Sequence, residues 1–326
     1  MVATRDLSHC AGSPLALVDL AFGRQTADMI DTSAITVGID GSEPSANALG
    51  WAAREAERRQ VVLRVVHSYT LPVYGAEFGG SMVFMPSDME TFETAHNKLV
   101  EDQLAPIRAT YPTLAVETHI VIGGAVASII DQAKDAQMVV TGSSGAGSVK
   151  AVLLGSVAHG VAHHSPCPVV LVPTERTHPV RMIVVGTDGS RASDAAVDWA
   201  RREALLWDAE ITVVHVWDYP YLDLDTRDGA VLPSDLMKSD AEEVLRHGID
   251  TLEAHPERPR KVHARLLEGA PSSALVDIAK DCDLLVIGAR GRGAIKAALL
   301  GSTSSYAIHH AQCPIAIVHA PPTGPT

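Results

Sequence analysis

The sequence has few cysteines, few aromatic residues and little positive charge. Four cysteines among 326 residues, none of them in a C-x-x-C pair, argue against a disulfide framework. The formal net charge of −13 argues against a broad surface for nucleic acid or anionic membrane, because such surfaces need clustered Lys and Arg. No apolar run is long enough to span a membrane, and no signal-peptide pattern is present. We therefore expect a soluble cytoplasmic protein that binds neither nucleic acid nor membrane.

The sequence contains one pattern twice. Asp40-Gly41-Ser42 recurs as Asp188-Gly189-Ser190, and His67 recurs as His215. A repeat of this length predicts two copies of one domain. Residues before the first copy have no counterpart and are expected to form a loosely ordered extension. The expected boundaries are residues 1–32 for the extension, 33–174 and 175–320 for the two domains, and 321–326 for a flexible tail.

Each copy alternates between strand and helix patterns. Short runs rich in Val and Ile alternate with Ala-rich stretches, which is typical of a parallel sheet covered by helices. The sequence thus predicts an α/β protein of two tandem five-stranded parallel-sheet domains. Ligands of such sheets bind beyond the carboxyl ends of the strands, where the strand order reverses. In the first copy the expected strands are residues 35–39, 61–67, 116–122, 138–141 and 169–172, and the expected helices are residues 44–59, 88–109, 126–134 and 148–163.

A glycine motif follows the fourth strand of each copy. The first copy has Gly142 and Gly145, then nine residues, then Gly155-Ser156. The second copy repeats the spacing with Gly288, Gly291 and Gly301-Ser302. Glycine lets a backbone reach positive φ and bring its amides close to phosphate oxygens without a Cβ in the way. Neither copy is a Walker A loop or a G-x-G-x-x-G run, so the motif predicts a phosphate site of a different kind, the alternative being a merely tight loop.

This combination of motifs resembles the ATP-binding branch of the universal stress protein family. Val37-Gly38-Ile39-Asp40-Gly41-Ser42 and Val185-Gly186-Thr187-Asp188-Gly189-Ser190 follow strand one, and the G-x2-G-x9-G-S pattern follows strand four. The resemblance covers nearly the whole chain after residue 32. It implies a Rossmann-like domain, also described as adenine nucleotide alpha hydrolase-like, with strand order 3-2-1-4-5. It also implies that ATP lies between strands one and four.

The resemblance further implies which residues hold the nucleotide. It places Asp40 and Asp188 beside the ribose, the phosphates or a bound Mg²⁺, and the adenine near Ser68 and Val216. The alternative for both aspartates is a carboxylate that caps a helix in a D-G-S turn. The expected nucleotide-binding set is Gly38, Asp40, Ser68, Gly142, Gly145, Gly155, Ser156 and Val157 in the first copy, and Gly186, Asp188, Val216, Gly288, Arg290, Gly291, Arg292, Gly301, Ser302 and Thr303 in the second.

The two glycine loops differ in charge. Ser144 and Ala146 of the first loop correspond to Arg290 and Arg292 of the second. We expect the second site to bind the triphosphate more tightly, because a guanidinium makes charge-assisted, often bidentate bonds with phosphate. The alternative is that both arginines point to solvent.

Two pairs of adjacent histidines also recur, each shortly before a Cys-Pro dipeptide. They are His163-His164 and His309-His310. One interpretation is a metal site. The other is that histidines near a helix C-terminus complement the helix dipole, and it is favoured because adjacent histidines on a helix point apart.

No acid, base or nucleophile recurs beyond the two aspartates, so no catalytic residue is expected. The resemblance implies a nucleotide-dependent regulator or sensor in the stress response. The alternatives are a slow ATPase or phosphotransferase, and a non-catalytic dimerising scaffold. The duplication predicts an internal pseudo-dimer that meets through the fifth strands, residues 168–172 and 314–318, and two chains are expected to pair as a homodimer. The expected ligand is ATP, with AMP and cyclic nucleotides left open, and the protein partner is unknown.

Overall fold

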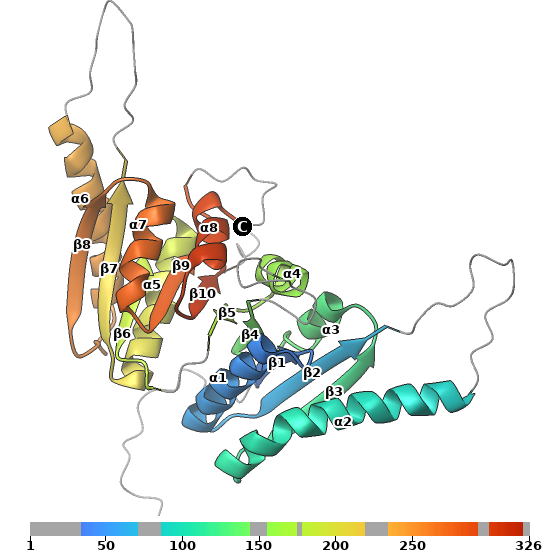
Figure 1. Ribbon diagram of the computed structural model, residues 1–326. Coiled ribbons are helices and arrows are strands. Elements are labelled where there is room, and N and C mark those ends of the chain that lie inside the picture. Colours follow the sequence, from blue (N-terminus) through green and yellow to red (C-terminus); the bar gives the residue numbers. More distant parts are fainter. Residues whose placement is uncertain are drawn as a thin grey trace, which may run out of the picture. The chain divides into compact units, whose positions relative to one another are not determined.

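The computed structural model describes residues 34–70, 86–143, 155–174, 178–218, 234–292 and 300–321 (Figure 1). The expected N-terminal extension and Gly145 lie outside these residues. In the first half the elements are β1 (Ile35–Ile39), α1 (Glu43–Arg59), β2 (Leu63–Tyr69), α2 (Pro86–Thr110), β3 (Val116–Ile122), α3 (Ala125–Asp131), β4 (Met138–Gly142), α4 (Ser156–His164) and β5 (Val169–Val172). In the second half they are β6 (Met182–Gly186), α5 (Arg191–Trp207), β7 (Glu210–Trp217), α6 (Ser234–Glu253), β8 (Val262–Glu268), α7 (Pro271–Ile278), a 3-10 turn (Ala279–Asp281), β9 (Leu284–Gly288), α8 (Ser302–His310) and β10 (Ile315–Val318).

The helix after the first strand of each half begins at a serine cap. The side chains of Ser42 and Ser190 accept hydrogen bonds from the amides of Ser45 and Ser193, which satisfies an otherwise unpaired N–H of the first turn. Both helices end where the next residue turns into the left-handed region. These caps fix α1 and α5 directly behind the Asp-Gly-Ser turns that follow β1 and β6.

All the described strands join into one ten-stranded sheet with the order β3-β2-β1-β4-β5-β10-β9-β6-β7-β8. Each half therefore has the expected order 3-2-1-4-5, and its strands are parallel. The two halves meet where β5 and β10 pair antiparallel, with Val170 opposite Ala316. This pairing is the expected pseudo-dimer contact through the fifth strands, and it satisfies both strand edges.

A buried apolar layer covers each face of the sheet, and each layer includes residues of both halves. Helices α1, α2, α5 and α6 contribute to one layer, together with inward residues such as Val170 and Ala316. Helices α3, α4, α7 and α8 contribute to the other layer, together with Leu171 and Ile315. Because β5 and β10 are buried on both faces, the junction of the halves belongs to the core.

A buried ion cluster joins α1 to α5 across the junction. Nη2 of Arg59 lies 3.1 Å from Oε2 of Glu55 and 2.5 Å from Oε2 of Glu203, the residue that corresponds to Glu55 in the second copy. The guanidinium carbon of the neighbouring Arg58 lies 3.9 Å from the ring centre of Trp207. Burial, followed by the nearby charge of Glu203, raises the pKa of Glu55 to about 7 although Arg59 opposes this. The cluster therefore makes the junction sensitive to pH.

Several expected element bounds differ from those of the structure. Helix α4 begins at Ser156, because Gly155 is its extended N-cap and donates its N–H to the Ser143 carbonyl at 2.8 Å. The part of the expected helix that covers residues 148–154 lies outside the described residues. The second strand, expected at residues 61–67, spans Leu63–Tyr69, because the amide of Val61 bonds to the Ala56 carbonyl and still closes α1. The helix expected over residues 126–134 ends at Asp131, where turns begin.

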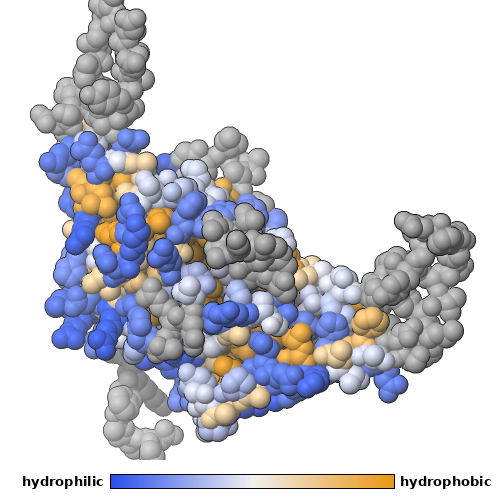
Figure 2. All heavy atoms as spheres, in the orientation of Figure 1, coloured by the Kyte–Doolittle hydropathy of each residue, from blue (hydrophilic) through white to orange (hydrophobic). Residues whose placement is uncertain are grey.

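Large hydrophobic side chains are rarely exposed in the described part of the chain. Among the described residues, the exposed large hydrophobic side chains are Ile122 and Tyr306. On the face seen in Figure 2, hydrophilic and hydrophobic residues are interspersed. No helix in the described ranges is long and apolar enough to cross a membrane. The homodimer of two chains stays a prediction.

Candidate functional site

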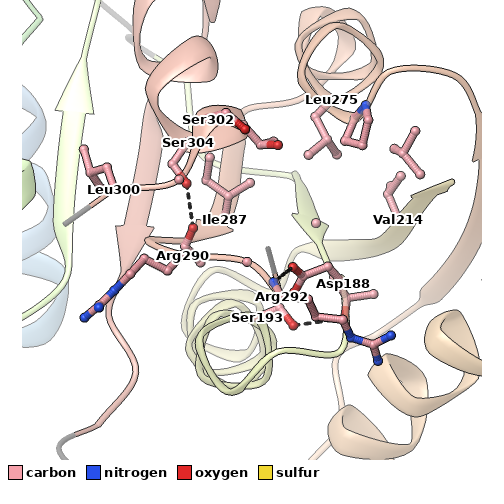
Figure 3. Close-up of a pocket in the computed structure, with 18 residues that line it drawn as sticks. Asp188, Ser193, Val214, Leu275, Ile287, Arg290, Arg292, Leu300, Ser302 and Ser304 are labelled. Carbon is pink, nitrogen blue, oxygen red and sulfur yellow. Dashed lines mark hydrogen bonds between the residues drawn. The ribbon is translucent and has the colours of Figure 1, made fainter. Parts of the chain in front are cut away.

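A cavity of about 450 Å³ lies in the second half, where the carboxyl ends of β6 and β9 meet (Figure 3). This is the topological switch point of the half, where the strand order reverses. From the gap between β6 and β9 the sheet continues through β7 on one side and through β10 on the other. All ten residues expected in the second copy line the cavity. The lining also contains residues that the sequence analysis missed: Thr187, Ser193, Val214, Pro271, Leu275, Ile287, Leu300 and Ser304.

Asp188 ties the turn after β6 to the glycine loop. Its Oδ1 accepts a hydrogen bond from the Ser190 amide at 3.0 Å, and its Oδ2 accepts one from the Arg292 amide at 2.9 Å. Burial opposes ionisation of this carboxyl, but hydrogen bonds from Ser190, the Arg292 amide and Ser193 outweigh it and lower the pKa. Asp188 is therefore an ionised carboxylate at neutral pH. It forms the D-G-S turn of the alternative interpretation and also lines the cavity.

Two glycines of the motif permit close approach of chain segments. A Cβ on Gly288 would lie 2.8 Å from the carbonyl carbon of Ala192 and 2.9 Å from the amide nitrogen of Ser193, both backbone atoms of α5. A Cβ on Gly291 would overlap Oδ2 of Asp188. The loop is therefore tight at both glycines, and both also line the cavity.

The amino end of α8 forms one wall of the cavity. Gly301 is its N-cap and supplies no capping side chain, and its own amide bonds to the Ala289 carbonyl at 2.8 Å. Ser302 and Thr303 follow in the first turn, whose amides have no partner within the helix. Oγ of Ser304 donates to the Gly288 carbonyl at 2.8 Å and anchors the helix to β9. A helix start held in this way favours an anion beside it.

The opposite part of the cavity is apolar. Val214 and Val216 of β7 and Leu275 of α7 line it, and Figure 3 shows Leu275 and Val214 on the side away from Arg290. Val214 and Val216 share one face of β7 because side chains alternate along a strand. A ligand that fits this cavity has an apolar part and an anionic part.

The two arginines of the second loop are both exposed. In Figure 3 the side chain of Arg290 extends away from Asp188. The Arg290 carbonyl accepts a hydrogen bond from Oγ of Ser190 at 3.2 Å. The guanidinium of Arg292 lies against Gly189, so closely that a Cβ there would overlap it. The tighter binding expected of the second site stays a prediction.

The first half repeats much of this geometry. Oδ1 of Asp40 accepts hydrogen bonds from the amide and the hydroxyl of Ser42 at 3.0 and 2.5 Å, and Asp40 is exposed. The amide of Gly155 donates to the Ser143 carbonyl at 2.8 Å, as that of Gly301 does to Ala289. A Cβ on Gly142 would lie 2.7 Å from backbone atoms of Pro44. Gly38 lies in β1, Ser68 in β2, and Ser156 and Val157 in the first turn of α4.

A repeated histidine supports the turn in each half. Nδ1 of His67 lies 2.9 Å from the Ile39 carbonyl, and Nδ1 of His215 lies 2.7 Å from the Thr187 carbonyl. Each ring therefore donates to the residue directly before Asp40 or Asp188. Burial is the main cause that lowers the pKa of His215. The repeat had shown these histidines, but only the structure shows that they position the turn.

The adjacent histidine pairs lie as the dipole interpretation expects. His163 and His164 are in the last turn of α4, and His309 and His310 are in the last turn of α8. In the described part of the chain, no group of three or more His, Cys, Asp or Glu side chains is placed to hold a metal ion.

Replacing Gly288 with alanine is expected to destabilise the protein by about 1 to 3 kcal/mol, because the new methyl group meets immovable backbone of α5. Gly301→Ala is the matched control from the same motif, since a Cβ there has nothing closer than 3.7 Å. Urea unfolding of both variants tests this. Equal midpoints for the two variants would show that the close approach at Gly288 is not what requires glycine.

Together these features describe a duplicated α/β protein with a ligand-sized cavity at its switch point. The model of the universal stress protein family matches residues 32–173 and 179–319. The chain belongs to the universal stress protein family, as a tandem member. This membership links it to the stress response.

Curated relatives and a solved structure are similar over most of the chain. Universal stress protein Rv2623 of Mycobacterium tuberculosis is 32% identical over 295 residues, covering 87% of this chain and 95% of the relative. A universal stress protein of Mycolicibacterium smegmatis is 32% identical over 292 residues, covering 87% and 96%. The crystal structure of a universal stress protein from Archaeoglobus fulgidus has a TM-score of 0.64 at 20% identity, covering 90% of this chain and all of that one, and supports the fold.

Proposed function

We propose that the cavity of the second half binds ATP and that the protein acts as a nucleotide-dependent regulator. The observation that carries the proposal is the cavity itself, which combines an apolar wall, an ionised carboxylate and an uncapped helix start. Its volume of about 450 Å³ falls in the range of small-molecule sites. A nucleotide presents an apolar base, ribose hydroxyls and phosphates in that order along its length.

Each part of the nucleotide has a matching part of the cavity. The base would pack on Val214, Val216 and Leu275, where apolar burial contributes most of the affinity. The carboxylate of Asp188 would accept a hydrogen bond from a ribose hydroxyl. The phosphates would lie at the start of α8, near the amides of Ser302 and Thr303.

A magnesium ion fits this arrangement. Mg²⁺ is bound by one or two carboxylates together with phosphate oxygens and water, and Asp188 supplies an ionised carboxylate. Bound there, the ion would neutralise part of the phosphate charge. Asp40 would serve in the first half, whose binding of ATP rests on the repeated geometry of Asp40, Gly142 and Gly155.

The cavity is better suited to binding ATP than to hydrolysing it. Among the described residues that line the cavity, Asp188 is the acidic side chain, and hydrogen bonds to both of its oxygens and a lowered pKa make it a weak general base. ATP would bias the contacts of the protein with a partner. The cytoplasmic location and the homodimer stay predictions.

Calorimetric titration with ATP, AMP and cAMP tests the proposal. We expect saturable binding of ATP at one to two molecules per chain, weaker binding of the other two nucleotides, and phosphate release at the background rate. Failure of all three nucleotides to bind would contradict the proposal and favour a scaffold. Sustained phosphate release would favour the ATPase alternative.

A further inference from the structure

A second pair of imidazoles in α4 lies outside the proposed nucleotide cavity. His159 and His163 are one helical turn apart, and their Nε2 atoms are 3.1 Å from each other. Their ring centres are 4.2 Å apart with a tilt of 42° between the planes. His163 was singled out above for its neighbour His164, but its contact partner is the histidine four residues earlier. That spacing places two side chains on the same face of a helix.

We propose that His159 and His163 chelate a divalent transition metal ion such as Zn²⁺. Neutral imidazole is the commonest protein ligand for these metals, and two nitrogens that already converge need little reorganisation. His159 is exposed and His163 is half-buried, so an ion reaches the pair from solvent. Water would fill the remaining coordination positions, as it fills the fourth position of catalytic zinc sites with three protein ligands.

The observed contact between the rings has a chemical consequence. One Nε2 now donates its proton to the other, so one ring has its proton on Nε2. Chelation needs a lone pair on both Nε2 atoms, and that proton therefore moves to Nδ1 of the same ring through solvent. The change is a tautomeric shift between neutral rings, so the shift itself releases no proton.

The repeat provides an internal comparison. His163 corresponds to His309, but His159 corresponds to Ser305, so the second half has no such pair on α8. Asymmetry between the copies predicts that this metal ion binds at α4 and not at the corresponding position of α8. The cluster has two protein ligands, which is consistent with the absence of a three-ligand group among the described residues.

Calorimetric titration of the untagged full-length chain with ZnCl₂, without nucleotide, tests the proposal. We expect one equivalent to bind wild type and the His164→Ala variant, because His164 is adjacent and exposed but is not paired with His159. Binding of that equivalent should be lost in His159→Gln and in His163→Gln. Wild-type affinity in both Gln variants, or an equal loss in His164→Ala, would overturn the proposal.

Two further measurements distinguish a loss of metal binding from a loss of folding. Unfolding midpoints without Zn²⁺ should agree among all four proteins, and added Zn²⁺ should raise the midpoint only where the pair is intact. Should a Gln variant unfold early, electron paramagnetic resonance of wild type with one equivalent of Cu²⁺ decides the matter. Coupling to two imidazole nitrogens supports the site, and coupling to oxygens alone overturns it.

Discussion

Replacing Ser302 with glutamate is expected to weaken ATP binding in the second half by at least about a hundredfold while leaving the fold intact. Ser302 is exposed, begins α8 and lines the cavity. A carboxylate about 4 Å from a phosphate charge is repelled by roughly 4 kcal/mol at an effective dielectric constant near 20. The same carboxylate interacts favourably with the helix start, so the unfolding midpoint should stay unchanged or rise slightly.

Ser302→Gln is the control, because it has the same size as glutamate without the charge. Calorimetry with ATP should show a far smaller loss for this variant. Ser156→Glu makes the equivalent change at the start of α4, and it should remove the first site alone. Equal ATP affinities of Ser302→Glu and Ser302→Gln would contradict the placement of phosphates at α8.

Replacing Glu55 with glutamine is expected to remove a large pH dependence of stability. Glu55 is fully buried, and its pKa is raised from 4.5 to about 7 by burial and then by Glu203. Folding therefore favours the protonated form. The stabilising contribution of this group is complete below pH 4.5 and is lost as the pH rises through 7. The shift corresponds to an upper limit of about 3 kcal/mol.

Glutamine stays neutral at every pH and keeps an oxygen that can accept from Arg59. The variant should thus match wild type near pH 5 and exceed its free energy of unfolding at pH 8. Urea unfolding across this range measures the effect. Glu93→Gln, at an exposed position of α2, is the control and should follow wild type. If the curves of wild type and Glu55→Gln run parallel, the buried carboxyl is not the source of the pH dependence.

Elements with a purely local cause were predictable from the sequence. The strands at Ile35–Ile39, Val116–Ile122 and Val169–Val172 have their predicted bounds, because short runs rich in β-branched residues predict strands. The strand order and the pairing of the fifth strands followed from the repeat and the family resemblance. The ten residues expected in the second copy meet in one cavity because their motifs follow neighbouring strands.

Features with a long-range cause were not predictable. Gly155, the N-cap of α4, donates its N–H to the carbonyl of Ser143, a partner that no local sequence pattern predicts. Pro271 and Leu275 enter the cavity from α7, whose sequence has no motif. Arg59 pairs with Glu55 within α1, but it reaches Glu203 of α5 only across the junction of the two halves. The pair His159 and His163, by contrast, was predictable, because residues four apart lie on the same face of a helix.

The most direct test of the central claim is to denature the purified full-length protein and to identify any released nucleotide by mass spectrometry. The account predicts about one to two molecules of ATP per chain, and fewer in a protein that carries both Ser156→Glu and Ser302→Glu. If no nucleotide is released, and none binds when ATP is added, the protein uses neither the cavity of the second half nor the equivalent position of the first half for ATP.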